Sequence, residues 1–331
     1  MRNTTIRLAN RPAREIENHN FIVAHEPIPP LQEGEISVAV EYISIDPAMR
    51  TWLADIVSYM PPVMPGEVMR AGGLGKVIAS SNPAYAIGDV LQGPFGVQTI
   101  YTGPPLRITT IDPDFAAPRH YLGGLGGTGL AAYFGLLKVG ALTPGDTVVV
   151  SAAAGAVGHV VVQMAKLKGH RVIGIAGGAA KCARVIAQYG ADACIDYKHD
   201  PVAAKLRALC PGGIDLYFDN VGGTVLEAVL DTLAMNARIV ISGAISEYNN
   251  IERVHAPRNY LNLIGKGARM QGLLNMHWVS EYESARLEMI TWMRNGQLIL
   301  DEHIEEGIEN FPTVLRMLFE GRNQGKLLLK V

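Results

Sequence analysis

The fold of this chain is decided by the stretch TVVVSAAAGAVGHV, residues Thr147–Val160. Apolar β-branched residues run into small residues and then glycines, a pattern that predicts a buried strand, a tight turn and the start of a helix. Gly155 and Gly158 stand where a dinucleotide-binding turn carries its last two glycines, and Ala153 takes the first place. Gly155 lets the backbone approach a pyrophosphate, and Gly158 lets the helix lie close to the strand. The N-terminus of that helix offers N–H groups to the anion. An ordinary strand-to-helix turn is the alternative.

The next part of this unit favours NADPH over NADH. The helix His159–Lys168 leads to a second strand, Arg171–Ala176. An NADH site has an acidic side chain near the end of that strand, which hydrogen-bonds the ribose 2′-hydroxyl. The segment Ala176–Lys181 (AGGAAK) contains no carboxylate and ends in a cation. A 2′-phosphate would be stabilised by Lys181 and by the N–H groups of the glycine turn. A solvated lysine at the start of a helix is the alternative.

Composition excludes several function classes. The chain has 331 residues, 48% of them hydrophobic and 18% charged, which is typical of α/β enzymes with a large core and allows two domains. The net charge of −2 and the lack of a Lys/Arg cluster argue against a nucleic-acid partner. The N-terminus has no apolar signal region, and no uncharged run is long enough to span a bilayer. Three cysteines, an odd number, fit a reduced chain. We expect a soluble, cytoplasmic protein.

The chain changes character near residue 145. Up to about residue 120, short alternating runs separated by Pro and Gly predict a mostly β domain. From Gly145 on, strand and helix patterns alternate, which predicts an α/β domain with a doubly wound parallel sheet. Its expected strands are Thr147–Ser151, Arg171–Ala176, Ala193–Asp196, Ile214–Asp219, Arg238–Gly243 and Arg269–Leu274.

The C-terminal tail is expected to return to the first domain. After a helix that ends near Gly296, the segments Leu298–His303 and Lys326–Val331 have strand patterns and flank a helical pattern at Phe311–Glu320. The sequence therefore predicts a discontinuous substrate domain, residues 1–125 and 300–331, and a cofactor domain, residues 126–299. A ligand would lie in a cleft between them.

Motifs spread over the whole chain carry a family resemblance. They are Ile45–Arg50 (IDPAMR), Gly66–Met69 (GEVM), Ala152–Gly158, Ala165–Gly169 (AKLKG), Ala176–Cys182, Phe218–Gly223 (FDNVGG), Ser242–Asn249 and Gly321–Lys326 (GRNQGK). With these motifs the chain resembles the medium-chain dehydrogenase/reductase superfamily, in its zinc-free branch of NADPH-dependent alkenal/one double-bond reductases. That branch includes prostaglandin reductases, plant alkenal reductases and bacterial curcumin reductase. The resemblance implies a Rossmann domain, a mostly β GroES-like domain and a homodimer.

The resemblance also implies a set of residues that bind NADPH. Lys181 and Tyr197 would hold the 2′-phosphate and its ribose, and Asn220 would lie near the nicotinamide ribose. Asn220 could equally be a turn residue beside a glycine, and Tyr197 could simply pack on a sheet edge. The other implied positions are Gly155, Ala156, Val157 and Gly158 at the pyrophosphate, Ser242, Gly243, Ala244, Ile245 and Tyr248 in a loop, Leu273, Leu274 and Asn275 at the nicotinamide, and Asn323 in the tail.

For the proton donor the resemblance favours Tyr59, which matches a tyrosine of the bacterial reductases. Tyr248 is the second candidate, although its phenol could serve the cofactor instead. The catalytic tyrosine of the plant members falls here on Gly265, and Tyr260, five residues upstream, would need a repositioned loop to replace it.

Two further residues are expected in the substrate pocket. Ala48 stands where the family usually has a bulky tyrosine, so the pocket would be larger or differently shaped. Arg50 would orient a carbonyl group, or would form a structural ion pair with Asp46 or Glu67.

No metal is expected. A catalytic zinc needs Cys and His ligands at the cleft and a structural zinc needs four cysteines, whereas the first domain has no cysteine and only scattered histidines. The expected reaction is the NADPH-dependent reduction of the C=C bond of a small hydrophobic enal or enone. Hydride would go to the β-carbon, and a tyrosine or water would supply the proton. The alternatives are a zinc-free quinone oxidoreductase and a non-catalytic NADPH-binding protein such as a redox sensor.

Overall fold

The computed structural model describes residues 2–56 and 60–331, without the side chains of residues 251 and 252. The chain forms two compact units. The first contains the residues up to Gly123 together with Glu302–Asn323 and Leu327–Val331, and the second contains Gly124–Asp301 and Gln324–Lys326. The sequence assigned the whole tail to the first domain, whereas Gln324–Lys326 packs with the second unit.

The second unit is built on a six-stranded sheet in the order β10-β9-β8-β11-β12-β13. Each pair of neighbouring strands is parallel, which confirms the expected doubly wound sheet. The first four strands in the chain have the expected bounds, but β12 begins five residues earlier than expected and β13 ends two residues earlier. The bounds are β8 Thr147–Ser151, β9 Arg171–Ala176, β10 Ala193–Asp196, β11 Ile214–Asp219, β12 Leu233–Ile241 and β13 Arg269–Gly272.

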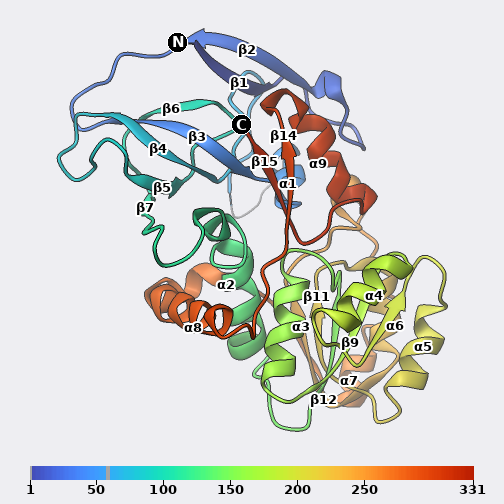
Figure 1. The fold of residues 1–331 in the computed structure, drawn as a ribbon. Helices are drawn as coiled ribbons and strands as arrows, with labels where there is room; N and C mark the ends of the chain where they lie inside the picture. The colour runs from blue at the N-terminus through green and yellow to red at the C-terminus, as the bar shows by residue number, and fades with distance from the viewer. Residues whose placement is uncertain (1, 57–59) are drawn as a thin grey trace. The chain divides into compact units, whose positions relative to one another are not determined.

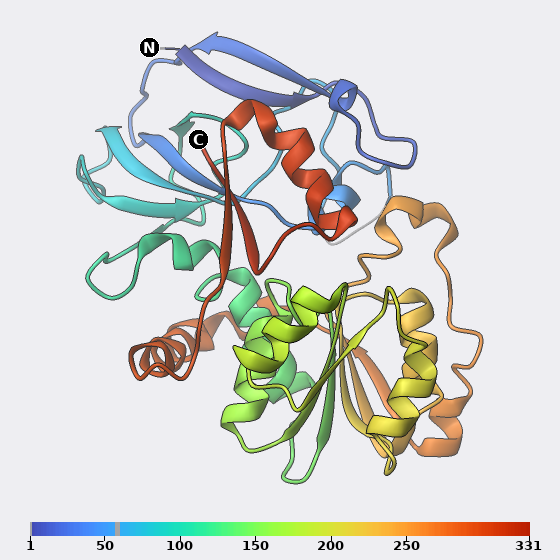
Figure 2. The same ribbon diagram turned by 45° about the vertical axis from the view of Figure 1, so that its right-hand side comes forward.

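Alternate side chains of this sheet face different helices, as the two-residue repeat of a strand requires. On one face Val149, Ile173 and Tyr217 join a buried core with Leu206 of α5 (Val202–Leu209) and Val229 of α6 (Gly223–Leu230). On the other face Gly174 leaves room for α4 (Ala179–Ala187), because a Cβ at that position would lie 2.7 Å from the Val185 side chain of this helix. Figures 1 and 2 show the helices on both sides of the sheet.

The other helical segments of the second unit flank this sheet or its connections. They are α2 Gly127–Phe134, the π-helical turn Gly135–Val139, α3 Gly158–Leu167, α4 Ala179–Ala187, the 3-10 segments Tyr248–Arg253 and Asn275–Glu281, α7 Asn262–Lys266 and α8 Tyr282–Arg294. No helix within the described part of the chain is both long and apolar enough to cross a lipid bilayer.

The first unit is mostly β, as expected. Its larger sheet has the order β14-β15-β3-β4-β5-β7, with β6 pairing with β3, and a separate hairpin joins β1 and β2. The bounds are β1 Arg2–Leu8, β2 Phe21–Pro27, β3 Ile36–Ser44, β4 Gly73–Ser80, β5 Val90–Gly93, β6 Ile100–Gly103, β7 Thr109–Thr110, β14 Glu302–Glu306, β15 Lys326–Lys330, α1 Ala48–Trp52 and α9 Phe311–Glu320, with 3-10 turns at Asn18–Asn20, Pro118–Leu122 and Ile308–Asn310.

The tail does return to this sheet, because β15 pairs antiparallel with β3 through Leu328 and Ser44. The expected strand at Leu298–His303 is displaced, however, and β14 begins only at Glu302. The reason is that the N–H groups of Ile299 and Asp301 donate hydrogen bonds to the side chains of Gln163 and His159 on α3, so they cannot pair with a neighbouring strand.

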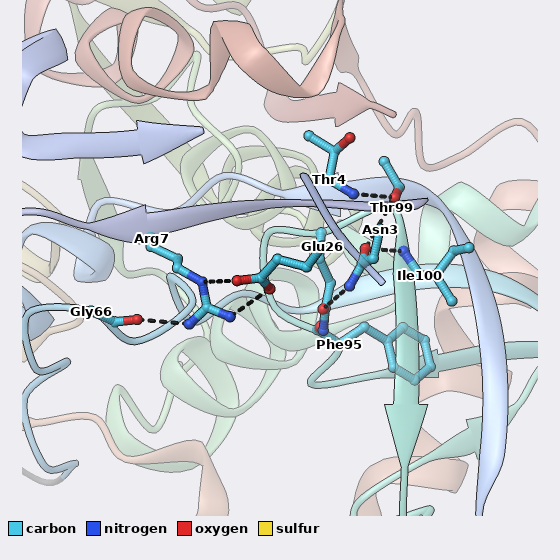
Figure 3. A network of polar contacts seen from close by, with 9 residues as sticks. Asn3, Thr4, Arg7, Glu26, Gly66, Phe95, Thr99 and Ile100 are labelled. Atoms are coloured by element: carbon cyan, nitrogen blue, oxygen red, sulfur yellow. Dashed lines mark hydrogen bonds and ion pairs between the residues drawn. The ribbon is translucent and has the colours of Figure 1, made fainter. Parts of the chain in front are cut away.

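Polar side chains attach the N-terminal hairpin to the rest of the first unit (Figure 3). The Arg7 guanidinium pairs with Glu26 at 2.7 Å and donates to the carbonyl oxygen of Gly66, also at 2.7 Å. The Asn3 side-chain oxygen accepts a hydrogen bond from the Thr99 hydroxyl at 3.0 Å. The contact of Arg7 with Gly66 holds the segment beginning at Gly66, which carries one of the family motifs, against the hairpin.

Candidate dinucleotide site

The turn after β8 has the shape that a pyrophosphate needs. A Cβ at Gly158 would lie 2.2 Å from the carbonyl oxygen of Ala152, so only glycine allows α3 to begin this close to the strand. A Cβ at Gly155 would meet only Ala152, which means that this side of the turn is otherwise open. No side chain caps the N-terminus of α3. The turn therefore leads into a helix N-terminus that has no side-chain cap, and the dipole of that helix favours an anion.

The turn after β9 is also built around glycines. The ring of Tyr197 lies so close that a Cβ at Gly177 would be 2.9 Å from it. The N–H of Gly178 donates to the Asp196 carboxylate at 2.7 Å, and the same carboxylate accepts from His199 at 2.7 Å. The hydrogen bond from His199 holds the pKa of Asp196 below its ordinary value, with the Gly178 N–H adding to the effect. Asp196 thus stays ionised while it shapes the turn.

Two lysines lie beside this turn. Burial lowers the pKa of Lys181 from its ordinary value, and the positive charge of Lys198 lowers it further. A partly buried ammonium close to a second ammonium is stabilised by an added anion, because the anion offsets both desolvation and repulsion. The arrangement fits the 2′-phosphate of NADPH and does not favour the bare hydroxyl of NADH.

A buried carboxyl group joins the carboxyl ends of β8 and β11. Oδ1 of Asp219 accepts from the hydroxyls of Ser151 at 3.1 Å and Tyr217 at 2.8 Å and from the N–H groups of Val221 and Gly222, each at 2.9 Å. The Asn220 side chain donates to the carbonyl oxygen of Ser151 at 2.8 Å. This network fixes the backbone and the amide of Asn220 at the edge where the cofactor would lie.

The loop after β12 is braced by Tyr248. Its phenol oxygen accepts the N–H of Ala244 at 3.1 Å, and a Cβ at Gly243 would lie 3.2 Å from the same oxygen. The N–H groups of Ser242 and Gly243 donate to the carbonyl oxygen of Asp219. The loop that carries five of the expected cofactor residues therefore lies at the same edge of the sheet as Asn220.

Known proteins are similar to this chain over most of its length. Residues 4–111 match the family model described as the N-terminal domain of oxidoreductase, and residues 156–292 match the one described as zinc-binding dehydrogenase. The NADPH-dependent curcumin reductase of Escherichia coli (strain K12) is 36% identical over 98% of this chain and 95% of its own length. The 2-alkenal reductase (NADP(+)-dependent) of Nicotiana tabacum is 36% identical over 90% of this chain and 88% of its own.

A solved structure is similarly close. The crystal structure of CurA in complex with NADPH from Vibrio vulnificus has a TM-score of 0.94 and 36% identity, and the match covers 99% of both chains. This chain belongs to the double-bond reductase branch of the medium-chain dehydrogenase/reductase superfamily. The resemblance inferred from the motifs is thereby confirmed, and so are the two architectures expected from it, the parallel α/β sheet and the mostly antiparallel sheet.

Some of the residues expected from the branch lie elsewhere. Tyr59 falls outside the described residues. Tyr260 is exposed and directly follows Asn259, whose amide donates to the carbonyl oxygen of Glu227 and to the carboxylate of Asp231 at the end of α6. That end of α6 lies at the amino ends of the parallel strands, away from the turn at Gly155. The structure does not bring Tyr260 to the cofactor edge.

The two expected pocket residues of this reductase lie in the first unit. Ala48 begins α1, and Arg50 on the same helix is buried. The Arg50 guanidinium donates to the carbonyl oxygen of Arg14 at 2.9 Å, so part of its hydrogen-bonding capacity holds the backbone. Burial lowers the pKa of Arg50 from its ordinary value. Within the described part of the chain, no three His, Cys, Asp or Glu side chains gather in a way that would hold a metal ion.

Sequence reasoning missed three site residues, Asp196, Asp219 and His159. Asp219 lies inside a motif that was quoted, but only its neighbour Asn220 was given a role. Asp196 ends the third strand, so its position at the carboxyl edge was a usable signal. His159 follows the last glycine of the fingerprint directly, yet its contact with Asp301 spans 142 positions of the chain.

The buried Asp219 carboxyl generates a prediction about pH. Burial raises its pKa above the ordinary value, although the N–H groups of Gly222 and Val221 act in the opposite direction. A raised folded-state pKa means that its contribution to stability is fully present below the unfolded pKa of about 3.9 and declines as the pH rises through the folded pKa. Asp219→Asn removes this charge and keeps an acceptor. The free energy of unfolding of the wild type should therefore fall relative to that of the variant as the pH rises above about 4.

Urea unfolding at a series of pH values measures this difference. The exposed Asp55→Asn variant is the control and should show no such trend. A constant difference between wild type and Asp219→Asn over the whole range would contradict the assignment.

Proposed function

We propose that this protein reduces the C=C bond of α,β-unsaturated aldehydes and ketones with NADPH and without a metal ion. Two parts of this function, the oxidoreductase class and the NADPH cofactor, are confirmed by the family to which the chain belongs. The substrate class, the direction of hydride transfer and the source of the proton are the parts that the proposal adds.

The observation that carries the proposal is the pair of lysines at the second glycine turn. Lys181 and Lys198 lie close enough for the charge of Lys198 to lower the pKa of Lys181. The Asp196 carboxylate beside the same turn accepts hydrogen bonds from His199 and from the N–H of Gly178. This charge arrangement favours a 2′-phosphate. It supports NADPH as a hydride donor that is held at the carboxyl edge of the sheet.

The relatives support the substrate class. Their names specify curcumin and 2-alkenals, compounds whose C=C bond is conjugated to a carbonyl group. Such a bond accepts hydride at the β-carbon because the carbonyl oxygen takes up the negative charge. NADPH supplies the hydride. The protein's own residues have to hold the enolate oxygen and deliver one proton to the α-carbon, which completes the reduction.

For the proton we keep Tyr59 as the first candidate and Tyr248 as the second. The phenol oxygen of Tyr248 already accepts a hydrogen bond from the N–H of Ala244, so it has a demonstrable role in shaping the loop. That role favours Tyr248 as a cofactor-side residue and leaves Tyr59, or water, as the donor. Ala48 and Arg50 remain the proposed pocket residues on the first unit.

A substrate panel with two phenol variants tests the function. NADPH oxidation should be observed with enals and enones, and Tyr59→Phe should lower kcat with these substrates about 100-fold while the Kd of NADPH stays unchanged, because general acid catalysis contributes that much. Tyr248→Phe is the matched comparison and should mainly raise the Kd of NADPH.

The other candidate functions are outcomes of the same panel. Turnover of quinones alone would indicate a quinone oxidoreductase. Tight NADPH binding without turnover of any substrate would indicate a non-catalytic NADPH-binding protein such as a redox sensor. Equal kcat for wild type and Tyr59→Phe would assign the proton to water.

The lysine pair gives a prediction on cofactor choice. Lys181→Ala should lower the preference for NADPH over NADH in kcat/KM by about tenfold or more, because a charge-assisted contact with the 2′-phosphate is lost. Initial rates with both cofactors measure the ratio. Lys205→Ala, whose lysine pairs with Asp200 on the surface at 3.6 Å, is the control and should leave the ratio unchanged. An unchanged NADPH/NADH ratio of kcat/KM in Lys181→Ala would show that this lysine does not contact the 2′-phosphate.

A homodimer through the sheet edge remains a proposal. β12 lies inside the sheet, because it pairs with β11 on one side and β13 on the other. β13 ends the strand order and all four of its residues are exposed, including Met270. We expect sedimentation to show a dimer, and Met270→Lys to shift it towards monomer. A wild-type monomer at micromolar concentration would exclude the pairing.

The three free thiols favour the expected cytoplasmic location.

A further inference from the structure

His159 lies in the first turn of α3, directly after the last glycine of the fingerprint, and is only 1% exposed. Its Nδ1 lies 2.8 Å from the carbonyl oxygen of Gly155, and its Nε2 lies 3.2 Å from the N–H of Asp301. A carbonyl oxygen only accepts and an N–H only donates. Nδ1 therefore carries the proton and Nε2 is the acceptor. The imidazole of His159 is thus neutral and in the Nδ1-protonated tautomer.

Asp301 is the last residue of the second unit before the chain passes to β14. Its carboxylate pairs with Arg184 of α4 at 3.0 Å and accepts a hydrogen bond from the Tyr189 hydroxyl. The Tyr189 ring also packs beside His159, with ring centroids 5.5 Å apart. The side chain of Asp301 is thus anchored to α4 and its C-terminal extension, while its N–H is directed at His159.

A closed ring of contacts runs from His159 through the returning tail. The carbonyl oxygen of Asp301 accepts the N–H of Lys326 at 2.8 Å, and the N–H of Gly325 donates to the carbonyl oxygen of Ala154 at 2.9 Å. Gly325 also forms a parallel bridge with Gly155. Gly325 has a positive φ of 59°, and a Cβ there would lie 2.3 Å from the carbonyl oxygen of Asp301. Only glycine therefore fits at this position.

We propose that His159 is a positioning residue for NADPH binding, which ties the segment at Asp301 and the tail Gln324–Lys326 to the pyrophosphate turn. The inference rests on the proposed cofactor site at that turn. The imidazole is the side chain through which Asp301 reaches α3 in this ring, and the main-chain bonds of Lys326 and Gly325 pass the restraint on to Ala154. A turn held from both sides keeps its N–H groups in place before the anion arrives.

Two variants separate the two ends of the imidazole. His159→Asn places an amide near Nδ1, so it retains the donor to Gly155 and loses the acceptor for Asp301. His159→Gln places an oxygen near Nε2, so it retains an acceptor for the N–H of Asp301. Because the ring of contacts passes through Asp301, His159→Gln should preserve the restraint on the tail and the affinity for NADPH, whereas His159→Asn should weaken both.

The experiment combines hydrogen exchange of the NADPH-free protein with NADPH titration. In His159→Asn, peptides covering residues 299–303 and 323–327 should exchange faster, and the Kd of NADPH should rise about threefold to tenfold, the effect of one buried hydrogen bond. With an enone substrate the KM for NADPH should rise similarly, while kcat at saturation changes less than twofold. His159→Gln should stay within about twofold of the wild type in each measurement.

Val161→Ala is the matched control, because it truncates another buried side chain of α3 that takes no part in the ring. It should lower overall stability without raising exchange selectively in the two peptides. Tyr189→Phe removes one anchor of Asp301 and should shift exchange and Kd in the same direction as His159→Asn, which keeps the test valid if a His159 variant does not fold.

The outcomes distinguish this inference from the proposed function. Unchanged exchange and Kd in His159→Asn, or equal losses in Asn and Gln, would overturn the positioning role, whatever the substrate. An equal loss of NADPH affinity in Val161→Ala would show that His159 acts only through the general stability of α3. A wild type that binds NADPH but reduces no enal or enone would contradict the proposed function and leave the assignment of His159 intact.

Discussion

The close approach of Gly158 to the carbonyl oxygen of Ala152 determines what can lie at the cofactor edge. Ala152 has φ of +47°, a conformation that L-residues rarely adopt, and it is held there by buried strands on both sides of β8. α3 begins directly against this carbonyl group and no side chain caps its N-terminus, so the positive end of the helix dipole lies at this edge of the sheet. The same close packing places His159 within reach of Gly155 and Asp301.

The acidic residues at this edge act on the protein's own backbone. Asp219 binds the N–H groups of Val221 and Gly222, and Asp196 binds that of Gly178, so each carboxylate orders a turn that would otherwise expose unpaired donors. This use of acids explains why a carboxylate close to the second turn is compatible with a phosphate. That carboxylate accepts hydrogen bonds from His199 and from the N–H groups of Gly178 and Lys198, and the ammonium groups of Lys181 and Lys198 lie beside the same turn.

The sequence predicted the sheet well because its central strands are continuous β-branched runs that end in glycine turns, and such runs are buried on both faces. The choice of NADPH followed from one local segment, Ala176–Lys181. Contacts between distant segments could not be read in this way. Asp301 and Gln324–Lys326 were assigned to the first domain by chain order, whereas hydrogen bonds hold them to the turn at Ala154 and Gly155. Tyr260 was placed near the substrate by counting along a loop that in fact runs to the opposite edge of the sheet.

The ring through His159 shows why a neutral side chain suits this position. A lysine or arginine there would add a charge beside the turn at which we propose that the pyrophosphate binds. It would also lack an acceptor for the N–H of Asp301. An imidazole donates to Gly155 and accepts from Asp301 at the same time, and in one tautomer it does so without net charge. The restraint on the tail is therefore geometric, and the proposed phosphate contacts are those of Lys181, Lys198 and the turns themselves.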